Sequence, residues 1–185
     1  LTTITITGNK NLTVTDSAKS TALATVNAAD FTGSTLVVTA NDSNAAMTVT
    51  ANTATSATIT TGDGADTVTV GDGGAALANS ITTGKGNDIV TSGAGADIIN
   101  VGTGSTAGAN NVTSGAGIDN ITAGDGADII DGGAGNDIIF GGAGDDLIIA
   151  GNGKDTLTGG LGSNVFEFKI GDGTNLINDF NVALD

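Results

Sequence analysis

Residues 132–149 read GGAGNDIIFGGAGDDLII, which is two consecutive nine-residue words with the same layout. Each word has glycine at positions 1, 2 and 4, aspartate at position 6 and a large aliphatic residue at position 8. Glycines at fixed places indicate a tight turn with unusual backbone angles. The residues around position 8 can form a short strand in which position 8 faces inward and positions 7 and 9 face outward. The stretch therefore predicts a turn and a strand that recur every nine residues.

The same word extends over residues 61–167, which divide into eleven units without remainder. Nine units have nine residues, and the units that begin at 70 and 101 have thirteen, because each carries a four-residue insertion before position 6. All eleven eighth positions are large and apolar. A single short strand cannot bury its own apolar face, so we expect two words per coil, with two parallel sheets around a thin aliphatic core.

Residues 1–60 carry a looser pattern, in which threonine alternates with apolar residues in short runs. These runs lie at 2–7, 12–15, 36–39, 47–50 and 57–60. Such alternation predicts short, half-buried strands separated by turns. The predicted fold is all-β: an irregular parallel β-helix over 1–60 runs into a parallel β-roll over 61–167, followed by a post-repeat segment over 168–185.

The composition excludes several classes of partner. The 185 residues carry 20 acids against 5 bases, all of them lysine, which gives a formal net charge of -15. Nucleic acid and anionic membrane surfaces would repel such a chain, and no apolar run is long enough to span a bilayer. We therefore expect no nucleic-acid partner and no direct membrane insertion. Since neither an initiator methionine nor a signal peptide stands at Leu1, we expect an interior fragment of a longer chain.

The periodic acids predict a metal site. Words two apart should share an edge of the solenoid, about 4.8 Å apart, so their aspartates and turn carbonyls stack into a column of oxygen atoms. Without a cation this column is a row of like charges. Ca²⁺, which takes six to eight oxygen ligands, fits it better than Mg²⁺, which demands a small octahedral site. We expect several calcium ions and folding that depends on them.

The word resembles the nonapeptide repeat G-G-x-G-x-D-x-U-x of the RTX (repeats-in-toxin) family, which binds calcium. The words at 132 and 141 match it at every defined position. The resemblance implies a parallel β-roll and export by type I secretion from Gram-negative bacteria. It also implies that the position-6 aspartates and the turn carbonyls are the calcium ligands. The implied ligands are Asp66, Asp88, Asp97, Asp119, Asp128, Asp137, Asp146 and Asp155, with Gly93, Gly95, Gly115, Gly117, Gly124, Gly126, Gly133, Gly135, Gly142, Gly144, Gly151 and Gly153.

Three words depart from this pattern, because Asn79, Asn110 and Asn164 replace the acid at position 6. Cages that use these turns are expected to be weak or empty. The best cages are expected to pair Asp128 with Asp146, Asp97 with Asp119, Asp119 with Asp137, and Asp137 with Asp155.

Two further stretches carry resemblances. The tail NVFEFKIGDGTNLINDF (164–180) is similar to the segment that follows the roll in many RTX exoproteins. The stretch ATVNAADFTGSTLVVTA (24–40) resembles the β-helical body of RTX-type bacterial surface-layer proteins. The implied function is a calcium-binding structural module of an exported surface-layer protein that self-associates into a lattice or docks on the rest of a longer chain. The alternative is a calcium-binding RTX module of a large adhesin or a type I-secreted exoenzyme.

Catalysis within this segment is not expected. The chain has no histidine, which excludes a zincin motif and a Ser-His-Asp triad, and it has no G-x-S-x-G elbow. The glycine-rich stretches 84–86 and 102–108 lie inside repeat turns, and neither completes a phosphate-binding loop.

Two other binding functions are open alternatives. Pairs such as Thr13/Thr15, Thr48/Thr50 and Thr67/Thr69 could stack into an ice-binding array, but their spacing drifts along the sequence. A carbohydrate-binding roll would lack tryptophan, tyrosine and arginine for contacts with sugars.

The last rungs of one sheet should present an exposed aliphatic ladder. Its outward positions are Ile129, Leu147 and Val165, with Ile149 alongside. Contiguous exposed apolar residues often mark interfaces, so this face is expected to dock a neighbouring subunit or a further segment of the chain.

Overall fold

The structure is a computed structural model that describes residues 2–16, 24–40, 45–51, 56–71, 77–102 and 108–181. The described residues form eighteen strands and no helix, so none of them form a helix that could cross a membrane. The four-residue insertions predicted in the words at 70 and 101 are residues 75–78 and 106–109, and the first two residues of each lie outside the described residues.

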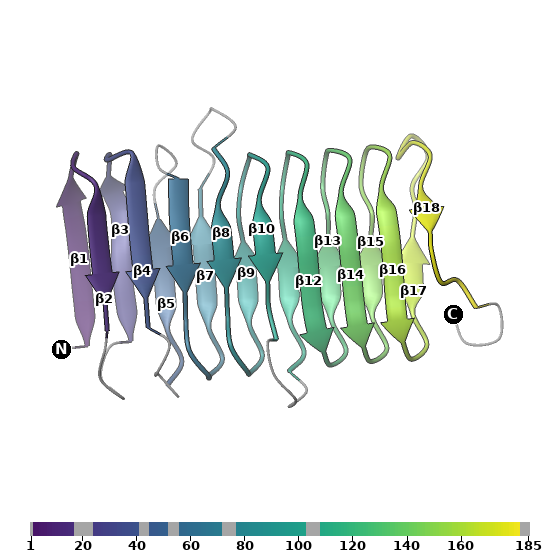
Figure 1. The fold of residues 1–185 in the computed structure, drawn as a ribbon, viewed down its shortest axis with the longest axis horizontal. Coiled ribbons are helices and arrows are strands. Elements are labelled where there is room, and N and C mark those ends of the chain that lie inside the picture. The colour runs from purple at the N-terminus through teal and green to yellow at the C-terminus, as the bar shows by residue number, and fades with distance from the viewer. Residues whose placement is uncertain are drawn as a thin grey trace.

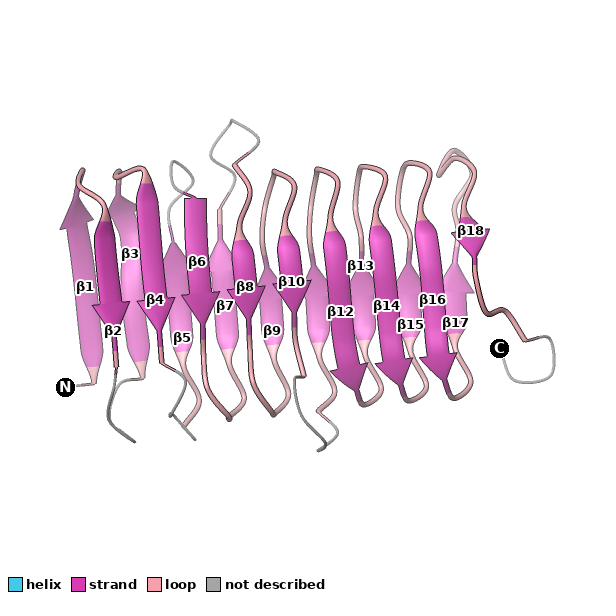
Figure 2. Cartoon of the chain, viewed as in Figure 1, coloured by secondary structure: helices cyan, strands magenta, loops and turns pink. Residues whose placement is uncertain are grey.

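The strands build two nine-stranded parallel sheets (Figures 1 and 2). The first sheet holds the odd-numbered strands in chain order: β1 (Thr3–Gly8), β3 (Thr25–Phe31), β5 (Thr48–Ala51), β7 (Thr67–Val70), β9 (Ile89–Thr91), β11 (Asn111–Thr113), β13 (Ile129–Asp131), β15 (Leu147–Ile149) and β17 (Val165–Glu167). The second sheet holds the even-numbered strands: β2 (Leu12–Thr15), β4 (Thr35–Thr39), β6 (Ser56–Thr60), β8 (Ser80–Thr82), β10 (Ile98–Asn100), β12 (Asn120–Asp125), β14 (Ile138–Ala143), β16 (Thr156–Leu161) and β18 (Leu176–Ile177).

Successive strands alternate between the two sheets, so each coil contributes one strand to each layer. Figure 1 shows the two layers face to face, with turns along both edges and with β1 and β18 at opposite ends. This arrangement is a β-solenoid of the parallel β-roll type, as the sequence predicts.

Position 8 of the word forms the core. Ten of its eleven residues, from Val68 to Leu157, are at most 1% exposed, and Phe166 at the C-terminal end is half-buried. In the N-terminal half, Val49 and Ile59 stand at the same place, because Val49 pairs with Val68 and Ile59 pairs with Ile81. The same thin aliphatic core therefore runs through both halves, which explains why residues 1–60 stack in register with the roll.

The N-terminal half differs from the sequence prediction in two respects. The strand β3 was not among the predicted runs, since TVNAADF lacks regular alternation, yet Val26, Ala28 and Phe31 are buried. The threonine pairs of the first sheet also stack although their spacing drifts along the sequence, because the turns absorb the differences in spacing. Along the first sheet, the outward residues Thr3, Thr25, Thr48 and Thr67 are in register, as are Thr5, Asn27, Thr50 and Thr69.

Candidate metal centre

The position-6 side chains form two columns, one along each edge of the solenoid. The first column precedes the odd-numbered strands and contains Asp66, Asp88, Asn110, Asp128, Asp146 and Asn164. The second precedes the even-numbered strands and contains Asn79, Asp97, Asp119, Asp137 and Asp155. Within each column, the Oδ1 atom of one residue accepts the backbone N–H of the position-6 residue one rung earlier. The N···O distances are 2.9 Å for Asp119 to Asp137, 2.9 Å for Asp137 to Asp155 and 2.9 Å for Asp128 to Asp146. The prediction that words two apart share an edge is confirmed.

The eight aspartates of these columns are buried, with at most 2% of each residue exposed. Their Oδ1 atoms have the backbone partner, whereas none of the eight Oδ2 atoms has a hydrogen-bond donor among the described residues. Burying a carboxylate oxygen without a partner costs several kcal/mol in folded proteins, so such atoms are rare. Eight of them in two regular columns indicate a missing positively charged partner.

Burial also changes the acidity of these groups. Desolvation raises the pKa of Asp137 to about 7, while the hydrogen bond from the Asp119 N–H lowers it and the neighbouring charges of Asp119 and Asp155 raise it. Desolvation likewise raises the pKa of Asp66 and of Asp128 to about 6. The pKa values of the other five column aspartates are raised for the same first cause. The metal-free fold therefore disfavours the ionised form of every acid in the columns.

At Asp137 and Asp146, the Oδ2 atom lies close to the carbonyl oxygen at position 1 of the next rung. A Cβ atom added at Gly132 would lie 3.0 Å from the Oδ2 atom of Asp137 and 2.7 Å from the carbonyl oxygen of Ala150, so both oxygen atoms lie close to this glycine. The Asp146 Oδ2 and the carbonyl oxygen of Gly159 flank Gly141 in the same way. Each of these two gaps brings a carboxylate oxygen and a carbonyl oxygen to the same glycine. In the gaps after Asp97 and Asp119, the corresponding carbonyl oxygens of Ser114 and Gly132 accept the hydroxyl groups of Ser92 and Ser114 at 2.8 and 2.7 Å. The sequence prediction did not include these position-1 carbonyls.

All twelve predicted position-2 and position-4 glycines have positive φ. Ten of them lie in the turns, and Gly124 and Gly142 lie near the ends of β12 and β14. Gly135, with φ of 149°, cannot be replaced by a larger residue, because a Cβ there would overlap the carbonyl oxygen of Gly117. Several position-2 carbonyls already accept a hydrogen bond from the next rung. The backbone N–H of Ala134 donates to Gly115 at 2.7 Å, and that of Asn152 donates to Gly133 at 2.7 Å. Their role as calcium ligands stays a prediction.

The carboxylates do not gather into clusters. Nowhere in the described part of the chain do three or more acidic, histidine or cysteine side chains come together at a spacing that could hold a metal ion. Each predicted pair, such as Asp137 with Asp155, lies on adjacent rungs and contributes one free Oδ2 per gap. Most ligands of an ion in such a gap must therefore be backbone carbonyl oxygens or water.

The acid columns begin abruptly at the boundary with the N-terminal half. Met47 donates its backbone N–H to Asp66 and Ala57 donates its own to Asn79, so both stand at position 6 of the rungs before the roll. Both residues are apolar and fully buried, as is Leu36 one rung further back in the second sheet. At these three positions the N-terminal half has an apolar side chain where the roll has a carboxylate, so no charge there calls for a cation.

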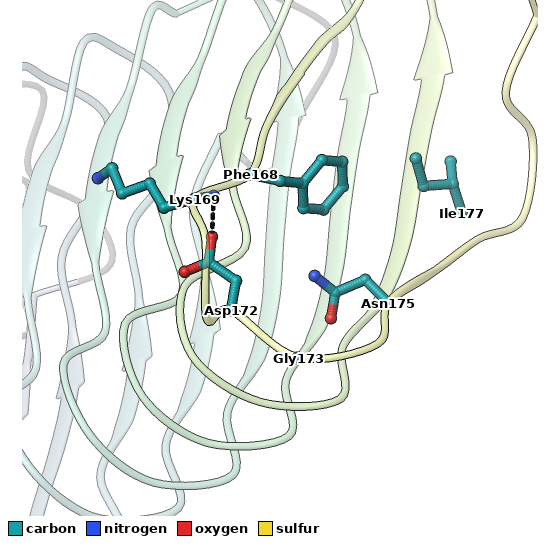
Figure 3. A pocket seen from close by; sticks show the side chains of 6 residues that line it. All are labelled: Phe168, Lys169, Asp172, Gly173, Asn175 and Ile177. Carbon is teal, nitrogen blue, oxygen red and sulfur yellow. Dashed lines mark hydrogen bonds between the residues drawn. The ribbon is translucent and has the colours of Figure 1, made fainter.

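Residues 170–178 were predicted to belong to the post-repeat segment, but they occupy the next rung of the second column. The Asn175 Oδ1 accepts the backbone N–H of Asp155 at 2.9 Å, and Gly173 pairs with Gly153. Figure 3 shows Asn175 and Gly173 in this turn. In the same turn, the backbone N–H of Lys169 donates to the carboxylate of Asp172. These residues line a cavity of about 250 Å³. A two-residue insertion at 168–169 displaces this word from the nine-residue period. The spacing of the sequence therefore did not reveal it as a repeat.

The C-terminal end of the first column is capped. The carboxylate of Asp179 accepts the backbone N–H groups of Gly159 and Gly160 at 3.0 and 2.7 Å. The ring of Phe180 packs edge-to-face on Phe166, with centroids 6.2 Å apart. These contacts cover turn N–H groups and a core residue that have no further rung beside them.

The donor set fits calcium. Buried anionic oxygens without a proton donor, facing carbonyl oxygens on flexible glycine turns, are the hard oxygen ligands that Ca²⁺ prefers. A family model described as the RTX calcium-binding nonapeptide repeat matches the chain in four copies, at residues 58–77, 73–106, 105–139 and 131–166. Comparison with curated proteins gave no match, and neither did comparison with solved structures.

Proposed function

Because this chain belongs to the family of RTX calcium-binding nonapeptide-repeat proteins, and is therefore a calcium-binding module, we propose a more specific role for it. It is the structural module of an exported bacterial surface-layer protein, which folds on Ca²⁺ outside the cell and supports self-assembly. The observation that supports the calcium-dependent folding in this proposal is the set of eight buried Oδ2 atoms without a donor.

These atoms couple folding to the cation. In a calcium-poor cytosol, the raised pKa values of the column aspartates work against burying them in ionised form, so the roll stays unfolded and exportable. Ca²⁺ supplies the positive charge and six to eight coordination positions. The chain supplies pre-stacked turns, in which the bonds between Oδ1 and backbone N–H hold each carboxylate in place.

A calcium titration followed by circular dichroism tests this role. Strand signal is expected to appear with a midpoint of about 10⁻⁴–10⁻³ M Ca²⁺, the range typical of extracellular modules. Mg²⁺ at the same concentrations should be much less effective. A chain that folds fully in the presence of a chelator at pH 8 would contradict the proposal.

The self-assembly part of the proposal is supported by the aliphatic ladder on the first sheet. Ile129 pairs with Leu147 and Leu147 with Val165, so the three residues stack on adjacent strands. Ile129 is 44% exposed and Val165 59%, while Leu147 and Ile149 are half-buried. Such a row favours contact with another copy of the chain or with a further segment of it.

The substitution Leu147→Glu tests this contact, because it leaves the turn and core positions intact. It should leave the calcium midpoint of folding unchanged and reduce sedimentation of the calcium-loaded protein. Asn111→Glu places the same charge two rungs away in the same outward row and is the control. A Leu147→Glu protein that assembles like its parent would remove the support from the ladder.

The finer assignment has one alternative: a calcium-binding module of a large adhesin or of a type I-secreted exoenzyme, which the C-terminal cap around Asp179 and Phe180 also suits. Electron microscopy of the calcium-loaded protein distinguishes them, since an ordered lattice is expected only of a surface-layer protein. We also propose that the segment itself is not an enzyme, because its carboxyl groups with raised pKa are all bound within the turn columns.

A further inference from the structure

The asparagines at position 6 are bonded differently from the aspartates. The Asn79 Oδ1 accepts the backbone N–H of Ala57 at 3.0 Å, and the Asn110 Oδ1 accepts that of Asp88 at 3.0 Å. This is the same bond that every column aspartate makes. The backbone of the turn is thus held equally well by either residue type, and the difference lies in the second side-chain atom.

That second atom is a nitrogen, and both of its protons are used. The Asn79 Nδ2 donates to the carbonyl oxygen of Ser92 at 3.2 Å and to the Oδ1 of Asp97 at 3.0 Å. The Asn110 Nδ2 donates to the carbonyl oxygen of Ala123 at 3.2 Å and to that of Gly108 at 3.3 Å. Ser92 and Ala123 stand at position 1 of the next rung, the place whose carbonyl faces the free Oδ2 in the aspartate rungs.

The side-chain NH₂ group of the asparagine therefore occupies the space between its own rung and the next. Where an aspartate brings an oxygen against a carbonyl oxygen, the asparagine brings a donor with two protons, and no unpartnered acceptor remains between the two groups. An NH₂ group that points at the carbonyl also occupies a place that a cation would need, and its partial positive charge would repel one. The gap before Asn110 is unaffected, because there the free oxygen comes from the preceding residue, Asp88.

We infer that Asn79 and Asn110 are calcium-independent clamps that close their gaps by hydrogen bonding and divide the columns into blocks that load separately. This inference rests on the proposed calcium-dependent folding. Asn110 separates Asp66 and Asp88 from Asp128 and Asp146 in the first column. Asn79 joins the second column to the apolar rung of Ala57, so the first turn of that column is held to the N-terminal half without metal.

The substitution Asn110→Asp tests the clamp, with Asn111→Asp as a matched control. Both add one negative charge to adjacent residues, but Asn110 is buried in the column and Asn111 is exposed on β11. Calcium-saturated Asn110→Asp protein should bind one more ion than the parent in equilibrium dialysis, whereas Asn111→Asp protein should bind the same number. Equal ion counts in all three proteins would overturn the inference.

A second readout does not depend on counting ions. In the folded protein, the side-chain NH₂ protons of Asn79 and Asn110 should exchange with solvent at least about tenfold more slowly than those of Asn111, as measured by nuclear magnetic resonance. Equal exchange rates would overturn the clamp. If the parent binds no calcium, the proposed function fails, and the clamp is then decided by the exchange rates alone.

Discussion

Replacement of Asp137 by asparagine is expected to have opposite effects with and without calcium. Asp137 lies in the middle of the second column, where its Oδ1 holds the N–H of Asp119 and its Oδ2 has no donor. An asparagine keeps the first bond and gives the second atom two protons to donate to the next rung, as Asn79 and Asn110 do.

The size of the effect follows from the raised pKa of Asp137. Burial raises it from an ordinary value of 3.8 to about 7. Each pH unit corresponds to about 1.4 kcal/mol, so the ionised carboxylate destabilises the metal-free fold by roughly 4 kcal/mol above pH 7. This penalty fades as the pH falls through 7 and is absent below about 4, where the carboxyl group is protonated in both states. The asparagine carries no such penalty at any pH.

In a chelator at pH 8, Asp137→Asn should therefore be more stable than the parent by up to about 4 kcal/mol, and the difference should shrink towards zero at pH 4. In calcium, the same variant loses an anionic ligand and should require a higher Ca²⁺ concentration to fold. Urea unfolding followed by circular dichroism measures both. Asp30→Asn removes the same charge from an exposed position of β3. It should change neither the metal-free stability nor the Ca²⁺ concentration required for folding. A metal-free Asp137→Asn protein less stable than the parent at pH 8 would refute the reasoning.

Four further outcomes are expected. Asp137→Ala should raise the Ca²⁺ midpoint of folding more than Asp66→Ala, since Asp137 has acidic neighbours on both sides and Asp66 ends its column; equal midpoints in the two titrations would contradict the bridging role. In the absence of calcium, acidification from pH 8 to pH 5 should increase the strand signal in circular dichroism, because the folded-state pKa values of about 6 to 7 lie above 3.8 and the fold takes up protons in that window. Chelation should unfold residues 61–167 while residues 1–60 keep more of their strand signal; equal sensitivity of the two separate segments would count against the division. Thermal-hysteresis measurements should detect no ice binding, because Asn27 interrupts one of the two threonine rows at the second rung and Ile89 interrupts the other after the fourth.

The sequence was sufficient for the parts of the fold that depend on the nine-residue period. Position 8 is apolar in every word because it faces the core, which position 1 also reaches at Val70 and Val101. The position-6 acids recur because each turn places them at the same edge. Both features could be read from the spacing of single residues such as Ile130 and Asp137. Where the period is broken, the prediction failed: the two residues inserted at 168–169 hid the word at 170–178, and the irregular composition of β3 hid a strand whose burial depends on pairing with its neighbours.

The backbone contribution to the site could not be predicted from residue types. The carbonyl oxygens of Ala150 and Gly159 belong to residues with no functional side chain, and only the stacking of rungs brings them opposite the aspartates. The one indication in the sequence is the small residue at position 1 of the words at 132 and 141. A Cβ atom added at Gly141 would overlap the Oδ2 atom of Asp146 in the same word, although the words at 61 and 83 have threonine at position 1.

The two polar atoms of the position-6 side chain therefore have separate tasks. The Oδ1 atom bonds to the backbone of the preceding rung, and it does so whether the residue is aspartate or asparagine, so it stacks the turns without regard to charge. The second atom faces the following rung and decides whether that gap needs a cation, as at Asp137, or is closed by the chain itself, as at Asn110. Because the two tasks lie on different atoms, a change of a single atom can alter the number of ions while the solenoid keeps its register. The dependence of the roll on calcium is thus set rung by rung, by the choice between oxygen and nitrogen at one position.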